Sequence, residues 1–264
     1  MTLLSEETPA LLLEVVRGDR SRRPRRDSGS AAGLRAELED VVFDHLGPER
    51  REVPWRISSA TVRGGPPAGP YVGGTLSRAR GVLITTALRL LVAQVHVDDP
   101  YDDALKAWRA RRAGSELLEQ VDHLDADQAA RLHAEVAAHF ETLQRLGPIP
   151  SNWSPRTCQR AYQMLGGGNV FLGDVVDLVV GSPHHESTNV ALVDITTSPL
   201  GIGAERVMRY HALIQTLRTS VVPLRTSMFS SATGELRTLD VDRELLMRGV
   251  EDLTHIISRL GETS

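Results

Sequence analysis

The spacing of hydrophobic positions in the first half of the chain is helical. Apolar residues recur at intervals of three and four over residues 34–46, 76–97, 101–113 and 125–146. The glycine-proline pairs at 47–48 and 147–148 are typical helix stops, and Asp125 is a typical N-terminal cap. The pattern therefore predicts a mainly helical first half.

The pattern changes after a proline-rich connection at residues 149–155. Short apolar runs, separated by glycine or polar turns, then predict strands, with a helix between the third and fourth and another at the end of the chain. The predicted strands cover residues 170–172, 174–180, 190–195, 221–229 and 235–239, and the helices cover 205–217 and 242–260. Strands joined by a helical crossover lie parallel and hairpin neighbours lie antiparallel, so we expect a mixed sheet. The predicted fold class is α/β (α+β), a mixed central sheet flanked by helices, with a helical N-terminal half.

These patterns divide the chain into three parts. Residues 1–33 form an N-terminal segment with an arginine-rich linker, residues 34–150 form the mainly helical part, and residues 151–264 form the core with the strands. The linker prediction comes from five arginines between positions 17 and 30 with no apolar period. An arm that contacts phosphates is the alternative interpretation.

Composition narrows the class of protein. With 264 residues and 41% hydrophobic content, the chain can bury a sizeable core without disulfide or metal staples. The single cysteine, Cys158, excludes an intrachain disulfide and a four-cysteine metal site and favours the cytoplasm. We expect no membrane partner, because no apolar run approaches the roughly 18 residues that a span needs. A net charge of -4 argues against coating nucleic acid by bulk charge but permits a local basic groove.

Two aspartates are the candidate centre of chemistry. Asp177 lies inside the apolar run 173–181 and Asp194 lies at the end of the run 190–195, and a charged residue in such a strand either caps a turn or binds a cation. Two aspartates on neighbouring strands can hold one Mg²⁺, which accepts a pair of carboxylates and fills its shell with water and phosphate oxygens.

The surroundings of these aspartates resemble the RecB family of PD-(D/E)XK nucleases. That family has a strand Gly-x-(Ile/Val)-Asp-Leu-x-x-Gly, a second strand ending in Asp/Glu-x-Lys-Thr, and a helix with Gln-x-x-x-Tyr. The corresponding segments here are Gly173-Asp-Val-Val-Asp177-Leu-Val-Val-Gly181, Leu192-Val-Asp194-Ile-Thr196-Thr197 and Arg206-Val-Met-Arg-Tyr210. The resemblance implies a restriction-endonuclease-like fold and Mg²⁺- or Mn²⁺-dependent hydrolysis of DNA. It also implies a metal held by Asp177, Asp194 and the Ile195 carbonyl.

The chain departs from the family pattern at three positions. The family lysine falls on Thr196, which cannot supply positive charge, the glutamine falls on Arg206, and an opening-helix histidine falls on Ser77 or Arg78. Lys106 is the chain's single lysine and belongs to a helix that is predicted to be exposed. Arg206 is therefore the predicted source of charge beside the metal, although an arginine stays protonated and cannot act as a general base. The resemblance thus gives Asp177, Asp194, Thr196 and Arg206 as catalytic residues and Arg206, Arg209 and Tyr210 as nucleic-acid contacts.

Two interpretations stay open. The first is an active nuclease, for which a separate helicase or other DNA-processing partner would unwind the substrate, because the chain has no glycine-rich loop ending in Lys-Ser/Thr. The second, favoured by Thr196, is a silent relative that binds nucleic acid or a protein. Among the histidines, His184 and His185 are predicted to lie in a solvated turn, while His211 could reach a phosphate.

Overall fold

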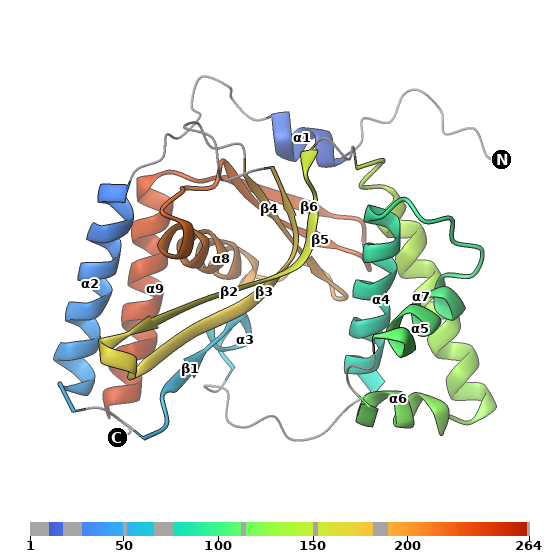
Figure 1. The fold of residues 1–264 in the computed structure, drawn as a ribbon, viewed down its shortest axis with the longest axis horizontal. Coiled ribbons are helices and arrows are strands. Elements are labelled where there is room, and N and C mark those ends of the chain that lie inside the picture. Colours follow the sequence, from blue (N-terminus) through green and yellow to red (C-terminus); the bar gives the residue numbers. More distant parts are fainter. Residues whose placement is uncertain are drawn as a thin grey trace.

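The computed structural model describes residues 11–17, 28–49, 52–65, 76–111, 115–149, 153–181 and 190–262. Within these residues a six-stranded sheet runs in the order β1-β3-β4-β5-β6, with β2 also paired to β3 (Figure 1). Pairs β1–β3 and β4–β5 are parallel and the others are antiparallel. The predicted mixed sheet, parallel across a helical crossover, is confirmed. The strands are β1 Trp55–Ile57, β2 Arg156–Leu165, β3 Val170–Val180, β4 Ala191–Thr196, β5 Arg225–Ser230 and β6 Leu236–Asp240.

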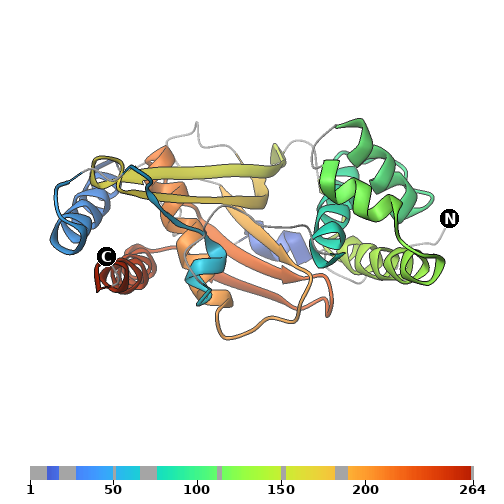
Figure 2. The ribbon, with the colours of Figure 1, turned by 90° about the horizontal axis from the view of Figure 1, so that it is seen from below.

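Helices flank the sheet in two groups, as the α+β prediction requires. Helices α2, α8 and α9 lie at one end of the molecule and α4 to α7 at the other (Figures 1 and 2). The α7 start is the predicted one, since the Asp125 side chain accepts a hydrogen bond from the backbone N–H of Gln128. The helices are α1 Leu11–Arg17, α2 Ser28–Leu46, α3 Ser59–Val62, α4 Leu76–Val92, α5 Pro100–Ala110, α6 Ser115–Asp122, α7 Ala126–Gln144, α8 Ala204–Thr219 and α9 Arg243–Glu262.

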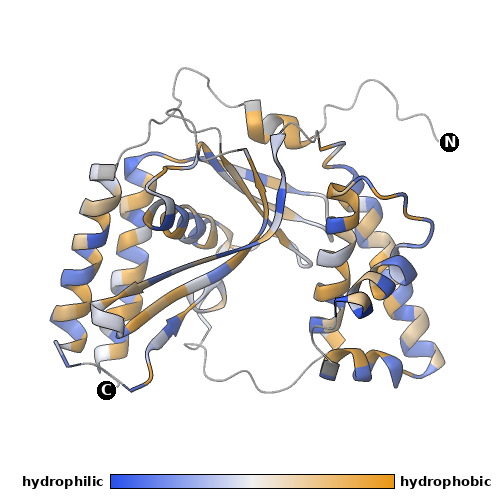
Figure 3. Cartoon of the chain, in the orientation of Figure 1, coloured by the Kyte–Doolittle hydropathy of each residue, from blue (hydrophilic) through white to orange (hydrophobic). Residues whose placement is uncertain are grey.

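Each helix group encloses its own apolar core against a different part of the sheet. The first core joins α1 and α4 to α7 to the ends of β3, β4 and β5, through Leu178, Val193 and Phe229. The second joins α2, α8 and α9 to β1, β2 and the start of β3, through residues such as Leu165 and Leu172. Figure 3 shows helices of both groups carrying hydrophobic and hydrophilic positions together, as expected for helices buried on one side.

Strand β3 is the longest of the described strands, and it pairs with three other strands. It pairs with β2 along nearly its whole length through a tight turn at Gly166–Gly168, whose three glycines all have positive φ. The glycine run is therefore the turn of the β2–β3 hairpin. Two strands predicted at 170–172 and 174–180 are one continuous strand, and β2 itself was not predicted.

The other edge of β3 is shared by two different strands. Strand β1 pairs with residues 170–172 and β4 pairs with residues 178–180, so the ladder on this edge is interrupted between them. Residues 55–65, which precede helix α4, thus supply a strand and a short helix beside the middle of the sheet. The interruption leaves the middle of β3 facing side chains from α3, α8 and the end of β4.

Candidate nuclease site

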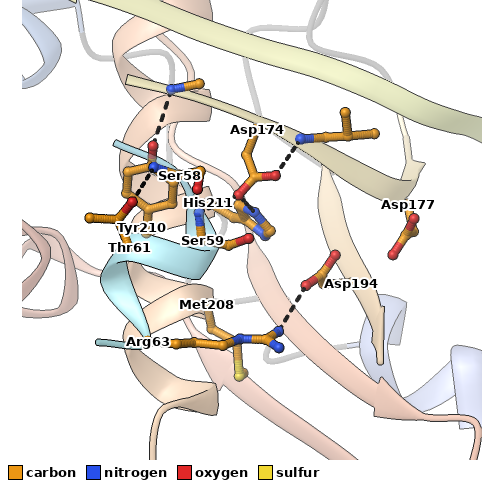
Figure 4. A network of polar contacts seen from close by, with 12 residues as sticks. Ser58, Ser59, Thr61, Arg63, Asp174, Asp177, Asp194, Met208, Tyr210 and His211 are labelled. Atoms are coloured by element: carbon orange, nitrogen blue, oxygen red, sulfur yellow. Dashed lines mark hydrogen bonds and ion pairs between the residues drawn. The ribbon is translucent and has the colours of Figure 1, made fainter. Parts of the chain in front are cut away.

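The interruption between β1 and β4 brings the two predicted aspartates together. The β3–β4 ladder ends at the pair Leu178–Val193. Beyond this pair, the backbone N–H of Ile195 on β4 donates a hydrogen bond to the side chain of Asp177 on β3, at 2.9 Å from its Oδ2 atom. Asp194 follows Val193 on β4, and its side chain points into the same space as that of Asp177 (Figure 4). The Asp177 side chain thus takes the place of a main-chain hydrogen-bond acceptor where β3 and β4 separate.

Asp194 is buried, Asp177 is half-buried, and the two carboxyls repel each other. Burial, followed by the charge of Asp194, raises the pKa of Asp177 well above its usual value. Burial also raises the pKa of Asp194, against the lowering effect of the His211 charge. Asp194 is only 8% exposed, so solvent does little to screen the pair. Two like charges in this position create a strong demand for a cation.

The backbone of Ile195 adds a third oxygen to this space. In an extended strand the N–H and C=O of one residue point to the same side, so the Ile195 carbonyl shares the side on which its N–H contacts Asp177. The next carbonyl, that of Thr196, faces the opposite side and accepts from the Ser231 N–H at 2.9 Å. Within the described residues no group of three or more His, Cys, Asp or Glu side chains is arranged to hold a metal. Two carboxylates and a carbonyl nonetheless fit Mg²⁺, which needs few protein ligands.

The cationic side chain beside the acid pair is Arg63. It lies at the end of α3, and its Nη2 atom is 3.9 Å from Asp194 Oδ2 (Figure 4). The same atom lies 3.9 Å from the Met228 sulfur, which keeps the guanidinium against β5. Because the Arg63 side chain is 43% exposed, it contacts the buried acid and still faces solvent.

Several predicted site residues lie elsewhere. Arg206 and Arg209 extend from α8 toward α9, where their Nε atoms are 3.7 Å and 2.8 Å from Asp252. The buried Tyr210 hydroxyl donates to the Ile57 carbonyl and accepts from the Gly173 N–H at 3.1 Å, so it joins β1 to β3. The structure therefore puts Arg63, rather than Arg206, beside the acids.

Thr196 and Lys106 lie where the motif and helix patterns place them. Thr196 is on the wall of the site, and its hydroxyl accepts from the Ser198 N–H at 3.2 Å. Lys106 is exposed on α5. The histidine pair at 184–185 lies outside the described residues.

A second polar pair, Asp174 and His211, lies next to the two aspartates and was not predicted from the sequence. Asp174 Oδ2 accepts from the first α3 N–H, that of Ser59, at 2.6 Å and lies 3.4 Å from Nε2 of the buried His211. Burial alone would raise the Asp174 pKa, but His211 and the Ser59 N–H outweigh it and lower the pKa to about 2. Burial would lower the His211 pKa, yet Asp194 and Asp174 raise it. His211 therefore faces Asp174 from a buried position, where its raised pKa favours the protonated form, and it does not reach outward to a phosphate.

A cavity of about 570 Å³ opens between α4 and the sheet in front of the acids. Its lining includes Asp177 and Thr196 together with four arginines, Arg63, Arg78, Arg89 and Arg160. Arg78 is one of the two positions that correspond to the opening-helix histidine of the family. Asp177 among four arginines, with Asp194 buried behind it, is a combination that suits a phosphate group bridged by a cation.

Cys158 lies on the wall of the same cavity. It occupies the position opposite Asp177 on β2, where the β2–β3 ladder is interrupted, and it has a positive φ of 49°. Arg89 Nε donates to its sulfur at 3.0 Å, while burial raises the pKa of the thiol despite this contact. The cysteine is thus held as a thiol that positions Arg89.

Comparisons with known proteins identify no family for the chain. No family model and no curated protein sequence matches it. A structure described as "Crystal structure of SSO0001" matches with 12% sequence identity and a TM-score of 0.30, over 84% of each chain. Among the described helices, none is long and apolar enough to cross a membrane.

Proposed function

We propose that the chain is a RecB-like PD-(D/E)XK nuclease that hydrolyses phosphodiester bonds in DNA with Mg²⁺ or Mn²⁺. The observation that carries the proposal is the meeting of Asp177 and Asp194 at the point where β3 and β4 separate, with Arg63 beside them. The strand-strand-helix-strand order that leads from β3 through α8 to β5 supports the family assignment. A cytoplasmic location is part of the proposal and is supported by the single, free Cys158.

The proposed roles of the site residues follow from their chemistry: oxygen ligands for the metal and a guanidinium for the phosphate charge. Asp177, Asp194 and the Ile195 carbonyl would hold the cation, which lowers the pKa of a bound water and withdraws charge from a phosphoryl oxygen. Arg63 supplies the positive charge that the family lysine would supply from the position of Thr196. A guanidinium binds phosphate oxygens well but stays protonated, so Arg63 stabilises charge and does not remove the proton from water.

The arginines of the cavity wall would hold the substrate backbone. Arg78 and Arg89 extend from α4 and Arg160 from β2, so the phosphates would be held from two sides of the opening. Charged hydrogen bonds of this kind position a strand without reading its sequence. A separate helicase would provide any unwinding, because these contacts offer no motor.

The test combines cleavage with metal binding. Purified protein with Mg²⁺ or Mn²⁺ should cleave labelled DNA, and Asp177→Asn should abolish cleavage while keeping the Ile195 hydrogen bond through the amide oxygen. Mn²⁺ should also raise the thermal midpoint of the wild type but not that of Asp177→Asn, since a ligand that binds the folded state stabilises it. Asp44→Asn, at an exposed position on α2, is the control. A wild type that neither cleaves DNA nor gains stability with Mn²⁺ contradicts the proposal.

The alternative is a silent relative that binds DNA or a protein, and the hydroxyl of Thr196 at the lysine position favours it. It predicts DNA binding without cleavage in the wild type. Thr196→Lys distinguishes the two, because it returns the missing charge to the same cavity. Cleavage that depends on Thr196→Lys would establish the silent form, whereas cleavage by the wild type would exclude it.

A further inference from the structure

The outward face of the β2–β3 hairpin is apolar and aromatic although it is exposed. Helix α8 packs against the other face, where Ala161, Leu165, Val170 and Leu172 belong to the second core. On the outward face Tyr162 is 60% exposed, while Met164 and Val175 are each 39% exposed. Figure 2 shows the hairpin along an outer side of the molecule with α8 beneath it. Exposed apolar side chains gathered on one face of a hairpin are a feature that binding surfaces share.

The aromatic rings on this face are ordered into a flat platform. Tyr162 stacks on Phe171 with ring centroids 6.1 Å apart and planes inclined by 12°. The Arg56 guanidinium carbon lies 5.3 Å from the centre of the Phe171 ring. Gly173 makes the arrangement possible, because a Cβ atom there would lie 2.3 Å from Cε1 of Phe171. The Phe171 ring is thus packed over bare backbone, and the more exposed Tyr162 ring lies against it.

This platform continues into the candidate nuclease site. Tyr162 pairs with Gly173, and the next outward pair along the hairpin is Arg160 with Val175. Arg160 and Val175 also line the cavity that contains Asp177. From Phe171 to Asp177 the strand advances by about 20 Å, at roughly 3.3 Å per residue. Aromatic rings, arginines and the acid pair therefore lie in sequence along one surface.

We infer that this face binds single-stranded nucleic acid by stacking a base on Tyr162 and guides the strand toward Asp177. Stacking platforms next to cationic side chains suit single strands, whose bases are free to stack on protein. Duplex bases are already stacked on one another, so a flat ring has no access to them. Arg56 and Arg160 complement the phosphate charge on either side of Tyr162. Only the delivery to Asp177 rests on the nuclease function proposed above.

The experiment measures binding in EDTA, where cleavage cannot interfere. Fluorescence anisotropy with fluorescein-labelled oligo(dT) and the full chain should give a dissociation constant that Tyr162→Ala raises by about 5- to 150-fold, the range for loss of one stacked base. Tyr162→Phe keeps the ring and should bind like the wild type. Phe43→Ala removes an aromatic side chain of nearly equal exposure, 59%, from α2 and should change nothing. Arg160→Gln should lower the salt dependence by about one phosphate contact.

The outcomes separate this inference from the nuclease proposal. A Tyr162→Ala variant that binds oligo(dT) like the wild type overturns the platform, even if the wild type cleaves DNA. Absence of oligo(dT) binding at low salt overturns it too, as does equal weakening of single-strand and duplex binding by Tyr162→Ala. Selective loss of single-strand binding establishes the platform, even if Mn²⁺ supports no cleavage.

Discussion

Asp174 offers the sharpest test of the buried network, and the perturbation is Asp174→Asn. The amide oxygen of asparagine can still accept the Ser59 N–H, so the change removes charge more than shape. It leaves His211, which is 2% exposed, without its nearest carboxylate at 3.4 Å. We therefore expect a loss of stability that depends on pH.

The pKa of Asp174 sets the size of the effect. A fall from 3.8 to about 2 corresponds to about 2.4 kcal/mol of folding free energy when the group is ionised, at about 1.36 kcal/mol per unit. The side chain is 17% exposed, so solvent screening removes little of it. Because the folded pKa is lowered, this stability is present above pH 3.8 and is lost as the pH falls toward 2. About half of it should remain at pH 3.

Urea denaturation of the wild type and Asp174→Asn at pH 5 and pH 3 is the assay. The difference in unfolding free energy should shrink by about 1 kcal/mol between these pH values. In the wild type His211 stays protonated throughout this window, since its pKa is raised above 6.5. A difference that is the same at pH 5 and pH 3 would refute the reasoning, and Asp44→Asn should show no such change.

Three further outcomes follow from the site. Asp177→Asn should raise the unfolding free energy measured by urea in EDTA at pH 7, because burial and Asp194 raise the Asp177 pKa and ionisation above pH 3.8 then destabilises the fold. Tyr210→Phe should lower the unfolding free energy by about 1–3 kcal/mol, since it leaves the buried main-chain groups that its hydroxyl joins without that partner. Arg63→Gln should lower kcat/KM for DNA cleavage by about 100-fold, as expected for a group that stabilises transition-state charge, while Arg206→Gln should leave it unchanged.

Local spacing was sufficient to predict most of the secondary structure. The helices α4, α5, α7, α8 and α9 and the strands β3 to β6 each have an apolar period or run long enough to recognise. Strand β2 was missed because its outward positions hold Arg160, Tyr162 and Met164, so it lacks the continuous apolar run of a buried strand. The three-residue β1 is too short for any period.

The acid pair could be predicted because each aspartate is a charged residue within or at the end of an apolar run of its own strand. The Asp174–His211 pair could not, since its recognition depends on β1 and α3 crossing to β3. The hydrogen bond from Ser59 to Asp174 joins residues 115 positions apart, so no local sequence pattern predicts it. Motif order also pointed to Arg206, which shares a helix with His211 but extends toward α9.

The position of Arg63 shows why the missing lysine misled the sequence argument. A half-buried and a buried carboxylate side by side favour positive charge in the space around them, and any element that reaches this space can provide it. Asp174 binds the start of α3 and Arg63 lies at its end, so the network that places the helix also places the guanidinium. Thr196 is then free to cap a turn through Ser198. In the proposed nuclease the positive charge beside the acids therefore comes from the end of α3 and not from β4, and α3 lies outside the segments that carry the motif.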